Sequence, residues 1–165
     1  MVVLNSTGET AASAVVVLDT NVALDCLLFL DPAVAPLRRA LEQGRLRWVV
    51  CPSMRQEFGW ILNSPSLCKW NPDSEHLLTL FDRCTSLQPE PKPAPARLRC
   101  DDADDQVFLD LALASGARWL LSHDKALLRL RRRMPPEGPL ICEPREWVAA
   151  AEEAASQEKG RPKPP

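Results

Sequence analysis

Hydrophobic positions follow two patterns along the chain: short continuous apolar runs, and longer segments with apolar side chains on one side only. Short runs rich in valine and leucine are typical of strands buried on both faces of a sheet. They predict strands over residues 14–18, 46–50, 119–121 and 138–141. One-sided apolar segments are typical of amphipathic helices. They predict helices over residues 21–29, 35–43, 54–62, 73–84, 104–115 and 145–153, with a short helix that starts at Lys125.

Small residues and prolines mark the ends of these elements. Gly44 and Gly116 directly follow predicted helices, as C-terminal caps do. Ser53 is predicted to cap the helix over 54–62, because a serine side chain accepts a free N–H of the first helical turn. Residues 88–98 (QPEPKPAPARL) carry four prolines, which exclude regular structure and predict a surface connection.

Strands that alternate with helices predict right-handed crossovers and a parallel sheet covered on both sides. The predicted fold class is therefore α/β, a three-layer α/β/α arrangement with a central, mainly parallel sheet. A chain of 165 residues is long enough for one domain with a full core. We assign residues 14–153 to this domain and expect the polar or proline-rich segments 1–13 and 154–165 to be flexible.

Composition narrows the possible functions. The net charge is only −2, so any binding of nucleic acid has to come from local patches. Six scattered cysteines without a C-x-x-C pair favour free thiols in a reducing cytoplasm, and two histidines are too few for a histidine-based metal site. No apolar stretch approaches the roughly 20 residues that span a bilayer, and the first residues do not resemble a secretion signal. We therefore expect a cytoplasmic protein without a membrane partner.

Acidic residues stand at four places where a site can form. Asp19 ends the first predicted strand in VVVLDTN, and Asp124 ends a later one in WLLSHD. Ligands of parallel sheets bind outside the carboxyl ends of the strands. Glu57 lies inside a predicted helix, and the cluster CDDADD precedes another. Each acid also has a local explanation, as a helix cap, as a partner of a helix dipole or as a solvated side chain.

Taken together, these acids favour a metal site. Carboxylates brought close to one another repel, so such a cluster needs a cation. Oxygen ligands without histidine or cysteine select Mg²⁺ or Mn²⁺ over zinc. Such ions can activate water, hold a phosphate and neutralise a leaving oxygen, which is the chemistry of phosphodiester hydrolysis.

Three segments, VVVLDTNVAL, CPSMRQEFGWIL and DADDQVFLDLALASGARWLLSHDKALL, resemble in their order and spacing the PIN-domain ribonucleases. The closest likeness is to the VapC-like toxins of bacterial toxin–antitoxin pairs, and it covers about residues 14–148. The resemblance implies a PIN-like fold and a Mg²⁺- or Mn²⁺-dependent endoribonuclease that hydrolyses phosphodiester bonds of RNA. It also implies a cognate antitoxin protein as partner and a homodimer formed through the helices at 21–29 and 35–43.

The motifs of the family imply roles for individual residues. Its first acid falls on Asp19, with the polar third position of that motif on Asn21. Its glutamate falls on Glu57. Its closing Thr/Ser-x-Asp motif falls on Ser122 and Asp124.

The Asp-Pro-x-Asp run of the family falls on DADD, residues 102–105. The resemblance places a metal-binding and catalytic acid on Asp105, with Asp19, Glu57 and Asp124, and an accessory acid on Asp102. Ala103 stands where the family has proline, so Asp104 remains the alternative to Asp105. We further expect Asp102 or Asp101 to cap the following helix, and Asp104 and Asp110 to face solvent.

Basic residues around the acids are candidates to hold the phosphate backbone of RNA. Lys125 and Arg129 are favoured because they follow Asp124 directly, whereas most of the others are expected to lie on solvated helix faces. These other candidates are Arg38, Arg39, Arg45, Arg47, Arg55 and Arg131 to Arg133. The tryptophans at 48, 60 and 119 are predicted to lie in the core, and Trp70 is predicted to be exposed.

Three alternative functions compete with the nuclease. A non-catalytic PIN-like module for protein binding is the main one, and the presence of acids at all four positions counts against it. A phosphatase of the D-x-D type lacks its second aspartate, because Asp19 is followed by Thr20 and Asn21. A nucleotide-binding fold needs a glycine-rich phosphate loop, and no glycine follows the first strand.

Overall fold

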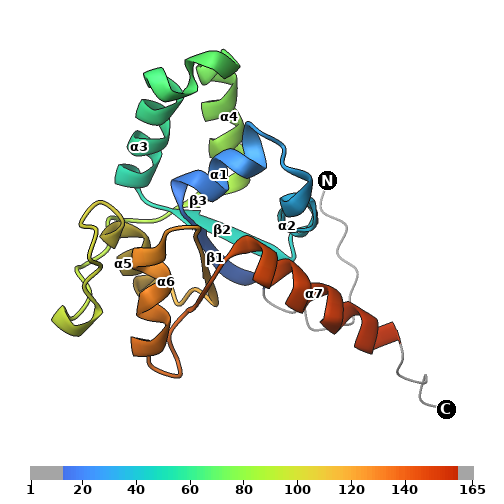
Figure 1. Cartoon of the computed structure of the whole chain (residues 1–165), viewed down its shortest axis with the longest axis vertical. Helices are drawn as coiled ribbons and strands as arrows, with labels where there is room; N and C mark the ends of the chain where they lie inside the picture. The colour runs from blue at the N-terminus through green and yellow to red at the C-terminus, as the bar shows by residue number, and fades with distance from the viewer. Residues whose placement is uncertain (1–12, 160–165) are drawn as a thin grey trace, which may run out of the picture.

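A parallel sheet of five strands, in the order β3-β2-β1-β4-β5, forms the centre of the part of the chain that the computed structural model describes, residues 13–159 (Figure 1). All four strand pairs are parallel, which confirms the predicted sheet. The strands are β1 (Ala14–Leu18), β2 (Leu46–Val50), β3 (Thr85–Leu87), β4 (Trp119–Leu121) and β5 (Leu140–Cys142). The central strand β1 ends in three fully buried residues, Val16, Val17 and Leu18, as expected for a strand covered on both faces.

Helices cover both faces of the sheet. They are α1 (Thr20–Leu27), α2 (Ala35–Glu42), α3 (Pro52–Leu62), α4 (Ser74–Cys84), α5 (Gln106–Ala114), α6 (Lys125–Arg129) and α7 (Pro144–Lys159). Short 3-10 helices are η1 (Pro32–Val34), η2 (Pro65–Trp70), η3 (Ala96–Leu98) and η4 (Leu130–Arg133). Helix α1 packs against α2, α3 and α4, whereas α5 packs against β1 and β4. Right-handed crossovers place α1–α4 on one face and α5 and α6 on the other, so the three-layer prediction is confirmed.

Several predicted boundaries are wrong, and the structure gives a physical reason for each error. Helix α3 begins at Pro52, whose fixed φ suits the first helical position, so Ser53 lies inside the helix and does not cap it. The acceptor comes instead from Glu90 of the proline-rich segment, which receives the Ser53 N–H at 2.5 Å and the Ser53 hydroxyl at 3.0 Å. Strand β3 was not predicted, because its sequence Thr-Ser-Leu carries no apolar run.

The remaining elements lie close to their predicted places. Gly44 and Gly116 have φ values of 68° and 63°, which confirms both glycines as left-handed residues after helices. Helix α5 starts at Gln106 and not at residue 104. Helix α7 extends away from the sheet as far as Lys159 (Figure 1), so its predicted end at residue 153 is wrong. Of the segment expected to be flexible, 154–165, residues 154–159 are helical and the others lie outside the described residues. The expected flexible segment 1–13 lies outside the described residues except for residue 13.

The tryptophans divide differently from the prediction. Trp48 is buried and packs edge-to-face against Phe81, with ring centroids 5.2 Å apart. Trp60 is 67% exposed, so its assignment to the core is wrong, because Met54, Phe58 and Leu62 form the buried side of α3. Trp119 is half-buried, and Trp70 is exposed as predicted.

Within residues 13–159, no single helix has the length and apolar composition needed to cross a membrane. Helix α1 and the segment Pro32–Glu42 have sufficient length and apolar composition only when taken together, and the chain bends by 100° between the two helices.

Candidate active site

The carboxyl ends of β1 and β4 lie side by side at the switch point of the sheet, because β2 and β3 follow on one side of β1, and β4 and β5 on the other. Strand β1 has β2 on one side and β4 on the other, and Leu18 of β1 is paired with Leu121 of β4. Such a switch point opens a crevice outside the strand ends, which is where ligands bind in open α/β sheets. Asp19 follows β1 directly, and Ser122 to Asp124 follow β4, so two of the predicted acids reach this crevice.

Asp19 has a structural contact on each of its carboxylate oxygens. The residue is only 4% exposed. Its Oδ1 accepts the backbone N–H of Val22 at 2.8 Å and caps α1, and its Oδ2 accepts the Ser122 hydroxyl. Burial raises the pKa of Asp19, although these two hydrogen bonds act in the opposite direction. The helix cap and the site acid, which the sequence presented as alternatives, are the same carboxylate.

Ser122 connects the two acids that follow the strands. Its side chain is fully buried, and its Oγ donates to Asp19 while accepting the backbone N–H of Asp124 at 2.9 Å. The Oδ1 of Asp124 accepts the backbone N–H of Ala126 at 2.6 Å, which caps α6. One hydroxyl therefore sets the position of Asp19 relative to Asp124.

Glu57 is brought to the same place from helix α3. The Thr20 hydroxyl donates to Glu57 Oε1 at 2.6 Å, across the gap between α1 and α3. Thr20 is buried and follows Asp19 directly, so Glu57 is held beside the first acid. The sequence predicts no role for Thr20, although its position inside the Asp-Thr-Asn motif is a signal for one.

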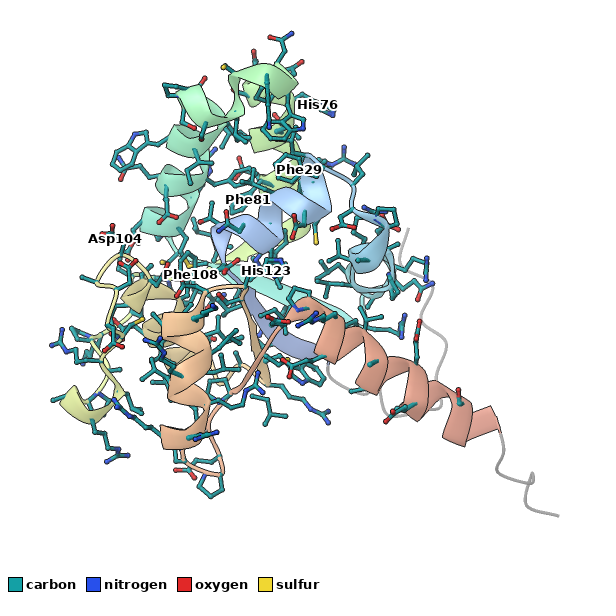
Figure 2. All side chains as sticks on the ribbon, viewed as in Figure 1. Phe29, His76, Phe81, Asp104, Phe108 and His123 are labelled. Carbon is teal, nitrogen blue, oxygen red and sulfur yellow. The ribbon has the colours of Figure 1, made fainter. Side chains whose placement is uncertain are left out.

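Asp105 completes the group from the start of α5. Burial raises the pKa of Asp105 to about 7, with further contributions from the negative charges of Asp124, Asp102, Asp19 and Glu57, in decreasing order. These charges can act on Asp105 only because the four carboxylates lie near it. Asp104, in contrast, is exposed on the loop before α5, where Figure 2 labels it. The charges of Asp19, Glu57 and Asp124 thus act on Asp105, which is half-buried, whereas its neighbour Asp104 is exposed.

Two expectations about neighbouring acids are wrong. Asp102 does not cap α5, because its Oδ1 accepts the N–H of Asp104 at 3.0 Å in the preceding turn and no side chain caps the helix. Asp110 does not face solvent: it is 8% exposed and its Oδ1 accepts the N–H of Ala94 and the Gln106 side-chain N–H, both at 2.8 Å. Asp110 thereby fastens the proline-rich segment to α5.

The other predicted residues lie at the rim. Asn21 is exposed in the first turn of α1, and Lys125 and Arg129 are exposed on α6. His123, which stands between Ser122 and Asp124, hydrogen-bonds Asp25 of α1 through its Nε2 at 2.8 Å. The sequence alone gives no signal for this contact of His123, because its two residues lie far apart in the chain.

The donor chemistry of the cluster fits a hard divalent cation. Within residues 13–159, no lysine or arginine forms an ion pair with Asp19, Glu57, Asp105 or Asp124. In their present positions, no three carboxylate, imidazole or thiol groups of the described chain are arranged to hold one ion directly. Mg²⁺ commonly keeps several of its waters and binds through one or two carboxylates, so the site does not need three direct ligands. Four carboxylates without a cationic side chain are a suitable environment for it.

Fold and site together define an α/β protein with a carboxylate cluster at the switch point of a parallel sheet. A family model described as PIN domain matches residues 15–126, which is more than half of the chain. The chain therefore belongs to the PIN domain family, whose members are generally nucleases, and the resemblance seen in its motifs is confirmed.

Comparison with solved structures agrees on the fold. A chain of the crystal structure of VapBC2 from Rickettsia felis, bound to a DNA fragment from their promoter, is similar with a TM-score of 0.52. The sequence identity is 13%, and the match covers 78% of this chain and 97% of that chain. A search among curated proteins gives no match.

Proposed function

We propose that this protein is a Mg²⁺- or Mn²⁺-dependent endoribonuclease whose catalytic and metal-binding residues are Asp19, Glu57, Asp105 and Asp124. The observation that carries the proposal is the convergence of these carboxylates, from four separate elements, on the switch point of the sheet. Membership in a family of nucleases supports it. A divalent ion bound here would supply Lewis-acid stabilisation of a phosphate and a water of lowered pKa.

The side chains of the protein have distinct tasks in this proposal. Asp19 and Asp124 hold their oxygens in fixed positions, because the Ser122 hydroxyl and two helix N-termini restrain them. Glu57 is restrained by one hydrogen bond from Thr20 and retains a free oxygen for a ligand or a water. The ionisation of Asp105 is opposed by burial and by the charges of its neighbours, so a bound cation would favour its charged form.

The first test is cleavage of end-labelled RNA by purified protein with Mg²⁺ or Mn²⁺, followed by excess chelator. We expect fragments that require the ion, and loss of cleavage in Asp105→Asn. Asp104→Asn is the matched control, because this neighbour is exposed and removal of its charge leaves the cluster intact. Cleavage that continues in chelator, or an Asp105→Asn protein as active as the control, contradicts the assignment.

We further propose that the protein acts in the cytoplasm as the toxin of a toxin–antitoxin pair. Support comes from the fold it shares with a chain of the VapBC2 structure. Co-expression with the product of an adjacent small gene is the test: the toxin role requires that this product bind the protein and restore growth that the protein alone inhibits. Absence of growth inhibition by the active protein contradicts it.

A homodimer formed through α1 and α2 remains a prediction. Most apolar side chains of these helices, among them Val22, Leu24 and Leu37, are used in the core. Others line a hollow of about 380 Å³ between α1, α2 and α4, including Leu27 and Leu41. Light scattering across a dilution series decides the matter, and a mass near 18.4 kDa at every concentration counts against the dimer.

A further inference from the structure

A row of basic side chains lies on one face of the continuous helical segment formed by α6 and η4. Lys125, Arg129 and Arg132 are spaced four and then three residues apart, which places them on the same face of a helix. The opposite face carries Leu127 and Leu130, both buried against the core. We call the three basic residues the basic track. It begins directly after the site acid Asp124.

The track borders a hollow large enough to take part of a nucleotide chain. Its volume is about 520 Å³, and it is lined by Lys125, Leu128, Arg129, Arg131 and Arg132. Cationic groups around a hollow raise the local concentration of anions. Leu128 adds an apolar wall, against which an unpaired base can lie.

Arg131 lies in the same wall but has a structural role. Its Nε donates to the Ile141 carbonyl at 2.7 Å, and its two terminal nitrogens form a forked pair with Glu146 at 3.1 and 2.8 Å. This guanidinium therefore joins η4 to β5 and α7, and its charge is matched by a carboxylate.

The residues of the basic track do not form close ion pairs of the kind that Arg131 forms with Glu146. Arg129 has only a loose pair with Asp101 at 3.6 Å, with side chains 71% and 74% exposed, and exposed pairs of this kind contribute little. Among the described residues, Lys125 and Arg132 form no ion pair. Three solvated cations beside a hollow are therefore available to an anionic chain.

We propose that the basic track binds the phosphate backbone of single-stranded RNA on one side of the scissile bond and guides that strand from η4 to the acid cluster. This inference rests on the proposed nuclease function. From Lys125 to Arg132 the helical segment rises about 10–12 Å, at ~1.5 Å per residue in α6 and ~2.0 Å per residue in η4. That length corresponds to roughly three stacked nucleotides at ~3.4 Å each. The strand is single because a duplex presents no free base to the Leu128 wall.

The test separates binding from cleavage by using the Asp19→Asn protein. Anisotropy of a fluorescein-labelled oligo-uridine gives its affinity for RNA as salt is raised from about 50 to 200 mM. We expect the log–log slope to become shallower by about 0.7 for each of Lys125→Gln, Arg129→Gln and Arg132→Gln, and by about 2 for the triple variant. The control is Arg39→Gln on α2, an exposed arginine on a helix well separated from α6 (Figure 1).

The possible outcomes each decide the proposal. The proposal is supported if the slope of log affinity against log salt becomes shallower for the three track variants but not for the control. Equal slopes for all variants overturn it, as does tighter binding of an RNA duplex of equal length than of the single strand. Failure of the nuclease proposal gives a different result. The wild-type protein then binds the oligonucleotide with the same dependence of affinity on salt, but it does not cleave the RNA in Mg²⁺. Circular dichroism of each variant establishes that a lost contact, and not a lost fold, is measured.

Discussion

Replacement of Asp105 by asparagine removes one negative charge from the acid cluster and changes little else, since the two side chains have nearly the same shape. Asp105 lies at the start of α5, where its side chain caps no helical N–H. The substitution therefore removes no helix-capping hydrogen bond. The metal-free protein should become more stable through this substitution, because it removes a carboxylate whose charge is disfavoured by burial and by its acidic neighbours.

The size of the gain follows from the pKa of Asp105. Its rise from 3.8 to about 7 spans roughly three units, and at 1.36 kcal/mol per unit the full value is about 4 kcal/mol. Asp105 remains in partial contact with water, which screens the charges that act on it. We therefore expect a gain of about 1–2 kcal/mol in the free energy of unfolding at a pH where the wild-type carboxylate is ionised.

The sign of the pH dependence is specific. Because the pKa of Asp105 is higher in the folded than in the unfolded protein, the folded state binds the proton more tightly. The stability contributed by this group is fully present below pH 3.8 and is lost as the pH rises toward about 7. The advantage of Asp105→Asn should therefore have about a third of its full size at about pH 5 and reach its full size at about pH 8.

Urea unfolding in chelator at these two pH values measures the difference, with Asp104→Asn as control. Mg²⁺ should then stabilise the wild-type protein more than Asp105→Asn, because the ion relieves the same repulsion. An Asp105→Asn protein that is less stable than wild type at both pH values, or an advantage that does not grow with pH, refutes the clustering of these carboxylates.

Three further substitutions test the contacts around the site. Thr20→Val removes the hydrogen bond to Glu57 without changing side-chain size, so the free energy of unfolding should fall by about 0.5–1.5 kcal/mol. RNA cleavage should fall as well, because Glu57 loses its restraint; full activity shows that Glu57 needs no such support. Asp110→Ala leaves the Ala94 N–H without its acceptor, so urea unfolding should show a loss of about 1–3 kcal/mol, and an unchanged midpoint contradicts it. Asp19→Asn should abolish cleavage at nearly unchanged stability, since an amide oxygen can still cap α1; a much lower melting temperature in chelator assigns Asp19 to structure alone.

The strand ends and their acids were predictable because both signals are local. The run before Asp19 is buried on both faces of a sheet, and that requirement appears in the sequence as an uninterrupted apolar stretch. The same holds for the strand before Ser122 and Asp124. Parallel strands place their carboxyl ends at one edge, so the proximity of these acids followed from topology.

The contacts that were missed join residues far apart in the chain. Asp110 was assigned to solvent because no pattern within α5 shows that the N–H of Ala94 lies opposite it. Ser53 was assigned as a cap because the competing acceptor, Glu90, comes from a segment whose path the sequence does not specify. Trp60 was assigned to the core on its size, although the spacing of Met54, Phe58 and Leu62 already places it on the other side of α3.

The dual role of Asp19 explains why its sequence motif supports both a structural and a functional interpretation. A carboxylate that only caps a helix leaves its second oxygen unrestrained. A carboxylate that only binds an ion needs another hydrogen bond to hold it in position. Here the cap fixes Oδ1 on Val22, and this fixes the direction of Oδ2 toward Ser122 and the strand end beyond it. Asp124 repeats the arrangement at the start of α6, with its amide bound to the same serine. Helix capping at two adjacent strand ends is thus the means by which the fold holds two carboxylates at one edge of the sheet. Both charges oppose the ionisation of Asp105, and a bound cation would relieve that opposition.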